Sequence, residues 1–593
     1  MKKCGIFSPD LIGKTLLGLI PAYFFASLAS MICEMVSGLL VGNLMIPEAI
    51  AAVGLASPYL RIFTAVSTVF AGGFRVACGQ FMGRGDLRSI REHFASAVLA
   101  LLGIGGLLTV AGLTLADPVA GLLGASGDMR IRTAAYIRGI SAGAVPTVLV
   151  PLLMVTCQMN NQGRKVLIAS GIQTAVSCGV GFAVMKTMPE NLFTAGIASA
   201  AGLLAAGVYL AAGLRERKGE ADRLSVRAGD FRLRAAADMV RIGAPAAVMQ
   251  LAGMLTVLGM NNLVMAYAGH DGISAIALRN YIYIVSDAVA VGVGQAAGAM
   301  VSVATGEGDR DQIRKIVRRG VLTATVLTAL VTLLFAGPSD FWAGLFGAKG
   351  KVRTYTADYV TACLLSSTLF AAVQVVTATF QAMGAVGIAT FSSVLTDCAL
   401  PLSGAFLLSR IFGIGGFWWL YTFAETVYLL LVFILSAVRM KKLPEGFGGL
   451  FDWVRIAAPE ATLHQQLDGP EKTSENSVEL QNFLREHGIT EKNAMFCALC
   501  TEEMCANIVQ HGFRKSGKKQ GLTVHIFASV ENGEATVRIR DNAVPFDPWS
   551  KMRMHTADPD DPCRNIGIRL VTGLAKEMTY QSIFGLNVVT IRM

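Results

Sequence analysis

The sequence predicts an all-α polytopic membrane protein, with twelve transmembrane helices in two parallel six-helix repeats, followed by a C-terminal α/β-sandwich domain. Three observations support this fold class. Of the 593 residues, 53% are hydrophobic and only 16% are charged, whereas soluble domains average about 25% charged residues. Nearly all long apolar runs fall before residue 440. Within that part, the same segments recur at a constant spacing.

The apolar part contains twelve runs, each long enough to cross the hydrocarbon core, which takes roughly 20 residues. The first six lie near 14–42, 50–73, 94–116, 134–156, 166–186 and 192–214. The second six lie near 240–267, 273–302, 317–336, 357–383, 387–409 and 414–438. We therefore expect an N-terminal lobe at residues 1–216, a connecting loop at 217–239 and a C-terminal lobe at 240–440.

The two sets of spans repeat one pattern. The segment 50–55 (IAAVGL) recurs 223 residues later at 273–278 (ISAIAL), and the loop Gly83–Asp86 (GRGD) recurs at the same spacing as Gly306–Asp309 (GEGD). Six spans return the chain to its starting side, so the repeats share one orientation and should be related by an axis along the membrane normal. Such a repeat indicates a two-lobed transporter that handles its solute where the lobes meet.

The net charge of +10 follows the order of the spans. Lys and Arg gather in the loops after the second, fourth, sixth, eighth and twelfth spans, and seven of them fall between Arg215 and Arg234. This is the positive-inside pattern, which predicts that both termini are cytoplasmic. We expect a multi-pass protein of a bacterial-type cytoplasmic membrane. The basic residues then serve topology, and no nucleic-acid partner is expected.

The composition changes abruptly after Lys442. The stretch Leu443–Gly449 (LPEGFGG) predicts a hinge within a linker at 441–455. Residues 456–593 have the pattern of an independent α/β domain with enough chain for its own core. The expected elements are a strand at 461–467, helices at 474–487 and 490–512, strands at 522–530 and 535–540 joined by an Asn-Gly turn, a helix near 567–576, and strands near 578–584 and 587–593. Because the linker is short, the domain should lie beneath the lobes, near the basic loop at 215–234.

A set of polar residues follows these elements in a specific order. Glu503 and Asn507 are four apart on one predicted helix and so face the same side. Asp541 ends a strand and is followed by Asn542, and Gly567 precedes a helix. A carboxylate can accept a hydrogen bond from the adenine amino group, a helix Asn can ligate Mg²⁺, and a glycine at a helix start lets the backbone approach phosphates.

Residues 456–593 resemble the gyrase and histidine-kinase superfamily of ATP-binding domains, specifically its anti-sigma-factor serine-kinase branch. The resemblance rests on three motifs, Glu502–Asn507 with His511 and Gly512, Asp541–Pro548, and Gly567 with Ile568. It implies that the domain binds ATP, and that serine-kinase activity toward a protein partner is one possible outcome. Ala543 and Asn565 stand where the family usually has glycine.

The resemblance also implies roles for single residues. Asn507 would hold Mg²⁺, Glu503 would act as general base, and Asp541 would contact adenine. Asn542 and Gly567 would complete the nucleotide site. The domain contains no Walker A motif, so ATP is not expected to power transport.

Residues 10–440 resemble the multidrug and toxic compound extrusion (MATE) transporters. The features that carry this resemblance are Pro21, Val41 with Gly42, the two Gly-x-Gly-Asp loops, and Pro245 with Asn262. It implies two lobes that rock against each other in the lipid bilayer and export a small organic solute, cationic or amphipathic. H⁺ or Na⁺ would be the coupling ion.

Charged residues within spans are costly, and each is a functional candidate by default. A local ion pair or a position near the lipid interface is the alternative explanation. The candidates for ion coupling are Glu34 in span one, Asn262 in span seven, Asp287 in span eight, Asp397 in span eleven and Glu425 in span twelve.

The family's coupling residues do not carry over one for one. Ser37 occupies the place, five residues before Gly42, where many members have an Asp, and span seven has no acid. Three interpretations remain open at this point. The chain is a secondary transporter with an ATP-binding regulatory domain, a membrane signalling protein with a serine-kinase or anti-sigma-like domain, or a flippase for a lipid-linked precursor.

Overall fold

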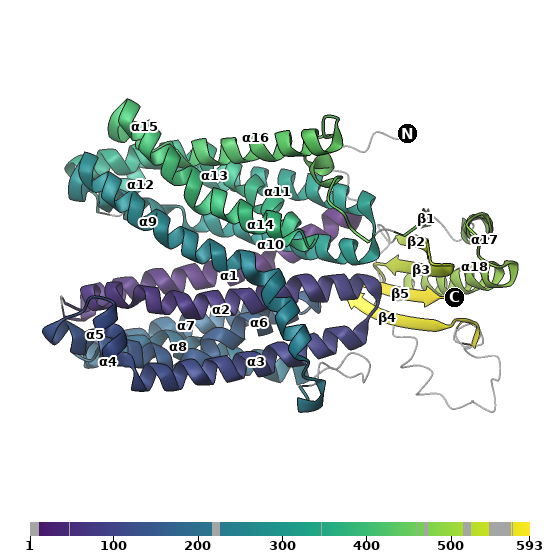
Figure 1. Ribbon diagram of the computed structural model, residues 1–593, viewed down its shortest axis with the longest axis horizontal. Helices are drawn as coiled ribbons and strands as arrows, with labels where there is room; N and C mark the ends of the chain where they lie inside the picture. The colour runs from purple at the N-terminus through teal and green to yellow at the C-terminus, as the bar shows by residue number, and fades with distance from the viewer. Residues whose placement is uncertain are drawn as a thin grey trace.

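The computed structural model describes residues 11–46, 48–215, 226–345, 347–457, 459–467, 472–513, 523–544, 571 and 573–593. In this part of the chain, eleven helices are long and apolar enough to cross a membrane. The number rises to twelve if the helices at Gly127–Ala142 and Ala144–Met159, bent by 43° against each other, form one span. The expected polytopic helical fold with a C-terminal α/β domain is therefore confirmed (Figure 1).

The N-terminal lobe is built from eight helices. They are α1 (Leu11–Leu44), α2 (Glu48–Arg84), α3 (Leu87–Thr114), α4 (Ala116–Leu122), α5 (Gly127–Ala142), α6 (Ala144–Met159), α7 (Gly163–Thr187) and α8 (Leu192–Arg215). The C-terminal lobe comprises α9 (Leu233–Ile282), α10 (Ile284–Glu307), α11 (Arg310–Ala336), α12 (Ser339–Leu345), α13 (Gly350–Ala382), α14 (Val386–Val394), the π-helical turn η2 (Leu395–Ala399), α15 (Leu400–Phe417) and α16 (Leu420–Met440). A 3-10 turn, η1 (Ala228–Asp230), precedes α9.

Helix α9 contains more than one span. Gly269 has a φ of 59° and breaks the regular helix, so the seventh span ends there and the eighth begins. A second break at Tyr283 separates the start of the eighth span from α10. The eighth span is therefore divided between the end of α9 and α10. The twelfth span of the pattern is the bent pair of α5 and α6, which is the fourth span along the chain.

The repeated Gly-x-Gly-Asp loops have the same conformation in both lobes. Gly85 and Gly308 have φ values of 77° and 74°, a region that favours glycine. The following residues, Asp86 and Asp309, accept hydrogen bonds from the backbone N–H groups of Ser89 and Gln312 and so cap α3 and α11. The sequence motif therefore encodes a tight turn followed by a helix start, once in each lobe.

The two lobes meet backbone to backbone along α2, α9 and α10. A Cβ added to Gly73 would lie 2.1 Å from the Met239 carbonyl oxygen, and one added to Gly83 would lie 2.2 Å from the Val303 carbonyl oxygen. A Cβ on Gly79 would overlap the Ser302 hydroxyl. Small residues allow such close approach of membrane helices. These contacts lie along the half of α2 that leads to the soluble domain, so the lobes are closed at that end.

The C-terminal domain is a sheet covered on one face by helices. Its five antiparallel strands are ordered β1 (Ala461–Leu467), β2 (Val524–Glu531), β3 (Glu534–Asp541), β5 (Leu586–Arg592) and β4 (Glu577–Ile583). Helices α17 (Thr473–Glu486) and α18 (Glu491–Asn507), the latter continued by the π-helical turn η5 (Ile508–Gly512), lie on one side of it. Leu480, Cys497 and Met504 pack there against inward residues of β2, β3 and β5.

The predicted turn between β2 and β3 is present. Asn532 and Gly533 have φ values of 51° and 76°, as a type I′ hairpin requires. The expected helix near 567–576 falls mostly outside the described residues.

The prediction of a hinge after the last span is wrong for its second half. Residues Phe447–Phe451 form a 3-10 turn, η3, and Phe451 is buried against Phe380, with ring centroids 4.8 Å apart. Arg314 of α11 binds both carboxylate oxygens of Asp452 at 2.8 and 3.0 Å. Arg310 donates to the carbonyl groups of Asp452 and Val454. Aromatic residues that follow the glycines fix this segment to the C-terminal lobe, so it is not a loose tether.

Candidate functional site

The first predicted motif of the soluble domain lies on α18. Asn507 and Glu503 are one turn apart and half-buried, and the Asn507 amide donates to the Glu503 carboxylate at 2.8 Å and to its carbonyl at 2.9 Å. The amide nitrogen is therefore committed to Glu503, and the amide oxygen is the atom suited to ligate a cation. The two side chains lie on one helix face, as the spacing predicted.

Asp541 is held at the end of β3 by a buried network. Its side chain is 3% exposed. Its Oδ1 accepts from the Asn587 amide and from the Ala543 backbone N–H, both at 2.8 Å. The Tyr580 hydroxyl donates to the Asn587 amide oxygen at 2.9 Å. Burial raises the pKa of Asp541, while the hydrogen bonds from Asn587 and Ala543 oppose this shift.

The sequence analysis missed Asn587 and Tyr580. Asn587 lies directly opposite Asp541 in the β3–β5 register, and Tyr580 is on β4. The order of these strands in the sheet is not their order in the chain, so no local spacing signals the contact. The sequence feature that could have indicated a role for Asn587 is that it is a polar residue among the apolar residues of β5.

The first two motifs meet in space. Helix α18 packs against β3, and a Cβ added to Gly512 would lie 3.2 Å from the Ala543 side chain. The Asn542 side chain accepts from the Thr523 backbone N–H at 3.0 Å, which braces the chain just after β3. Gly567 and Ile568, which form the third motif, and Asn565 before them lie outside the described residues. A buried carboxylate at the end of the central strand β3 and an amide oxygen on the helix packed against it suit an adenine nucleotide with a divalent cation.

In the C-terminal lobe, Asp287 has a local partner. Arg279 Nη1 lies 3.2 Å from Asp287 Oδ2, and Arg279 Nε donates to Cys363 Sγ at 3.2 Å. The guanidinium also lies over the Tyr283 ring, 5.1 Å from its centroid. The sequence analysis did not single out Arg279. The sequence feature that could have indicated Arg279 is a basic residue within the eighth span, eight positions before Asp287.

Glu425 lies in the second turn of α16 and is 6% exposed. Its Oε2 is buried and has no hydrogen-bond partner in the part of the chain that the structure describes. It interacts electrostatically with Arg279 and Asp287, and also with Asp397. Of the acids predicted in spans eight and twelve, Asp287 therefore pairs directly with Arg279, and Glu425 lies within electrostatic range of both.

Asp397 and Asn262 differ in their surroundings. Asp397 is half-buried on the π-helical turn η2, and its carboxylate accepts from the Thr396 hydroxyl at 3.1 Å. Its backbone carbonyl accepts from Thr256 of α9 in a very short contact. Asn262, also on α9, is exposed. The structure therefore places Asp397, but not Asn262, among buried polar groups.

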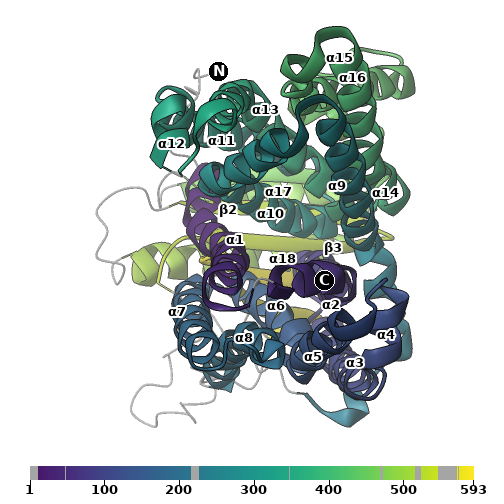
Figure 2. The same ribbon diagram turned by 90° about the vertical axis from the view of Figure 1, so that its left-hand side faces the viewer.

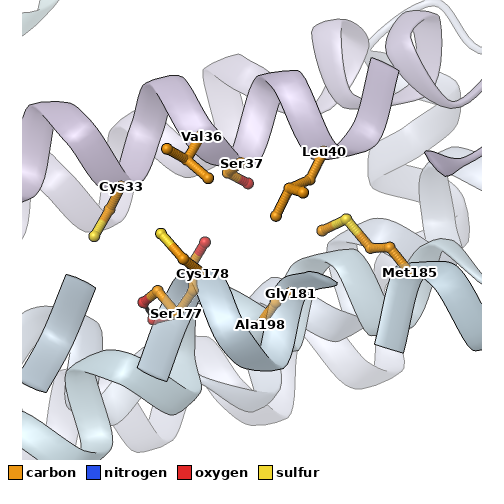
Figure 3. Close-up of a pocket in the computed structure, with 10 residues that line it drawn as sticks. Cys33, Val36, Ser37, Leu40, Ser177, Cys178, Gly181, Met185 and Ala198 are labelled. Carbon is orange, nitrogen blue, oxygen red and sulfur yellow. Dashed lines mark hydrogen bonds between the residues drawn. The ribbon is translucent and has the colours of Figure 1, made fainter. Parts of the chain in front are cut away.

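The N-terminal lobe has a small pocket between α1, α7 and α8 (Figure 3). It is lined by Cys33, Val36, Ser37, Leu40, Ser177, Cys178, Gly181, Met185, Ala198 and Ser199. Hydroxyl and thiol groups are its polar lining among the described residues. Glu34 is exposed on α1 and does not line this pocket.

Comparison with known families identifies both parts of the chain. The model of the MatE family matches residues 22–185 and 245–402, more than half of the sequence. The chain belongs to the MatE family. A second family model, described as a histidine kinase-like ATPase domain, matches residues 469–593. The protein is thus a MATE transporter with a C-terminal domain of the nucleotide-binding type.

Solved MATE structures share the fold of the membrane part. The outward-facing conformation of a multidrug resistance MATE family transporter of the MOP superfamily is 16% identical, with a TM-score of 0.67, and covers 74% of this chain and 98% of its own. A MOP superfamily transporter from Pyrococcus furiosus Vc1, described as having a reverse polarity of its binding pocket, is 17% identical with a TM-score of 0.66 and the same coverage. No curated protein sequence matches the chain. At this identity the structures show the MATE fold alone.

Proposed function

We propose that this MATE transporter exports a small organic solute, cationic or amphipathic, in exchange for H⁺ or Na⁺. The observation that carries the proposal is Glu425, a buried carboxylate within a span, with one oxygen unpaired among the described residues and the Arg279–Asp287 pair beside it. A charge in this setting is costly unless it is neutralised by a proton or paired with a cation. Glu425 is therefore the preferred coupling residue.

The neighbouring charges give this site two states. When Glu425 is ionised, Arg279 is shared between it and Asp287. Arg279 lies 3.2 Å from Asp287 in the structure, and we expect this pair to persist when Glu425 binds H⁺ or Na⁺. Cation binding thereby changes which groups Arg279 holds on α10 and α16. Asp397, the third acid of this lobe, adds negative charge that favours a cation.

We propose that the protein lies in a bacterial-type cytoplasmic membrane with both termini and the C-terminal domain in the cytoplasm. The support is the excess of Lys and Arg in the loops on the domain's side. Arg84, Arg310 and Arg314 all lie there, next to the domain or its linker.

We further propose that the C-terminal domain binds ATP with Mg²⁺. Asp541 would accept from the adenine amino group, Asn542 and Gly567 would complete the site, and Asn507 would ligate the cation through its amide oxygen. Glu503 orients that amide and is the candidate general base. Bound ATP would supply either a regulatory signal or a transferable phosphoryl group. The serine-kinase and flippase interpretations are not favoured by the family matches.

The coupling proposal is tested by gradient-driven transport in proteoliposomes. Glu425→Gln keeps the size of the side chain and removes its charge, so we expect solute transport under an H⁺ or Na⁺ gradient to fall by about tenfold or more. Asp128→Asn, at an exposed acid at the start of α5, is the matched control and should transport at the wild-type rate. Wild-type transport by Glu425→Gln would contradict the proposal and move the site to Asp397 or Glu34.

A further inference from the structure

The sheet of the C-terminal domain has a second face, and that face lies on the transporter. Along β3, Val537 and Ile539 pack under α17 and α18, whereas Arg538 and Arg540 point the other way. On β5 and β4, Val588 and Ile583 join the hydrophobic core of the lobes. Strand alternation therefore gives one face to the nucleotide-binding side and the other to the membrane part.

One Gly-x-Gly-Asp loop, that of the C-terminal lobe, is held by charged groups of the sheet. Arg540 forms an ion pair with Glu307, which is 5% exposed, and donates through Nη1 to Gln312 Oε1 at 2.8 Å. His464 of β1 lies 3.6 Å from Asp309. Both Glu307 and Asp309 belong to the repeated motif.

The matching loop of the N-terminal lobe is held by β4 and β5. Arg592 donates to the Arg84 carbonyl. A Cβ added to Gly85 would lie 3.3 Å from the Thr579 hydroxyl and 3.8 Å from Thr590. The sheet therefore touches both copies of the same motif, one in each lobe. Seen along the long axis, it lies behind the boundary between the two sets of helices (Figure 2).

Between these two loops the lobes are already closed. Gly83 abuts Val303 and the Glu307 backbone, and Gly306 abuts the Gln80 carbonyl. Alternating access requires the lobes to separate at this end at some point in the cycle. A sheet bound to both loops opposes that separation.

We propose that the C-terminal domain is a clamp, which grips both Gly-x-Gly-Asp loops and holds the lobes closed on its side. The proposal deepens the transport function proposed above, because closure matters only if that side opens during transport. The lobes must either pull one loop from the sheet or carry the domain with one lobe. In both cases, the contact energy between the sheet and the loops adds to the free energy needed to separate the lobes on that side.

The strands β3 and β5 each carry residues of both the clamp and the nucleotide site. Asp541 faces α18 and Arg540, the preceding residue, faces Glu307. On β5, Asn587 holds Asp541 while Val588 packs into the lobes. A nucleotide that shifts the ends of β3 and β5 therefore shifts the clamp residues as well. By linkage, a nucleotide that weakens the clamp binds more weakly when the clamp is engaged. A nucleotide that strengthens the clamp binds more tightly in that state.

Docking of the sheet also buries an arginine charge, and the free-energy cost of this burial favours release. Arg538 is 6% exposed, and its Nε and Nη1 are buried without a hydrogen-bond partner among the described residues. Its guanidinium lies over the Phe527 ring at 5.8 Å. Burial lowers the pKa of Arg538 to about 10. Undocking would hydrate this charge, which distinguishes the interface from a permanent hydrophobic core.

The test measures opening of the lobes on the domain's side. Ser302 is fully buried against Gly79 at the seam, so a cysteine introduced by Ser302→Cys, in a full-length background lacking other cysteines, reports opening by its reaction with a membrane-impermeant maleimide applied from that side. We expect Arg540→Gln combined with Arg592→Gln to raise the labelling rate several-fold. Arg485→Gln, which removes an exposed pair with Glu491 in the same domain, is the control and should leave the rate unchanged.

Equal labelling rates in the clamp variant and its parent would overturn the proposal. If the double variant does not fold, as judged by size-exclusion chromatography, Glu307→Gln breaks the same ion pair from the transporter side and carries the same expectation. ATP with Mg²⁺ should change the labelling rate of the parent but not of the clamp variant. An equal change in both proteins would overturn the link to the nucleotide site.

Failure of the clamp can be told apart from failure of the transport function. Labelling requires no solute and no ion gradient. Faster labelling of the clamp variant with no gradient-driven transport by the parent would support the clamp and refute the proposed exchange. Transport by the parent with unchanged labelling would do the reverse.

Discussion

At the scale of single residues, Asp541 depends on groups far away in the chain. Its carboxylate is buried, and Asn587 and the Ala543 N–H fix one of its oxygens in place. Tyr580 in turn orients the Asn587 amide. A carboxylate held by two hydrogen bonds, one of them from an amide that is itself fixed by a third, loses little conformational entropy when it binds a ligand, so such a network suits specific recognition of a base.

We expect Asp541→Asn to weaken ATP binding to the full-length protein by about 1.5–3 kcal/mol, because a charge-assisted hydrogen bond is lost. Isothermal titration calorimetry of the protein in nanodiscs measures this directly. Glu491→Gln, at an exposed acid at the start of α18, is the matched control and should bind as the wild type does. Equal affinities of Asp541→Asn and wild type would show that adenine is not bound at Asp541.

The residues of this site differ in how far the sequence could predict them. Glu503 and Asn507 were predictable, because a spacing of four on a helix places two side chains together whatever the rest of the fold does. Asn587 was not, because its contact with Asp541 depends on β5 lying between β3 and β4. Arg279 was overlooked for a different reason. Its importance comes from Glu425 and Cys363, which lie on other helices.

At the scale of elements, the repeated loops explain why glycine is required at the seam. Gly85 and Gly308 need a positive φ, whereas Gly83 and Gly306 need the absence of a side chain. The repeat predicted that the two loops are equivalent. It could not predict that they face each other across the lobes and support one sheet.

Gly83→Ala should therefore impair closure of the lobes. Its Cβ would meet the Val303 carbonyl at 2.2 Å, and overpacking of this kind costs about 1–3 kcal/mol. We expect faster labelling of the cysteine introduced by Ser302→Cys and a lower temperature of thermal unfolding. Gly103→Ala on α3, where no atom lies within 4 Å of the added Cβ, is the control. A Gly83→Ala protein that labels and unfolds like this control would contradict the packing described for the seam.

The apolar spans were the most predictable elements and the linker was the least. Each span carries its own signal in length and composition. The stretch after Lys442 contains Pro and Gly, which indicated a hinge, yet Phe451 and Asp452 bind it to α11 and α13. Local composition predicts the conformational flexibility of a segment only when no neighbouring surface binds that segment.

At the scale of the whole molecule, the position of the C-terminal domain could be predicted only in part. A short linker places it beneath the lobes, as expected. The sequence pointed to the basic loop at 215–234, much of which lies outside the described residues, whereas the described contacts fall on the Gly-x-Gly-Asp loops and on Asn161. The docked face of the sheet is polar and carries buried arginines. Because a polar strand face is also typical of exposure to water, the sequence did not indicate that this face is docked.

We propose that ion gradients drive this transporter and that its C-terminal ATP-binding domain regulates it. The most direct test is solute transport by the wild-type protein in proteoliposomes, under an imposed H⁺ or Na⁺ gradient, with and without ATP and Mg²⁺ on the domain's side. We expect transport to require one of the gradients and ATP to change its rate, while ATP without a gradient supports none. Transport driven by ATP alone, or a gradient-driven rate indifferent to ATP, would contradict the account.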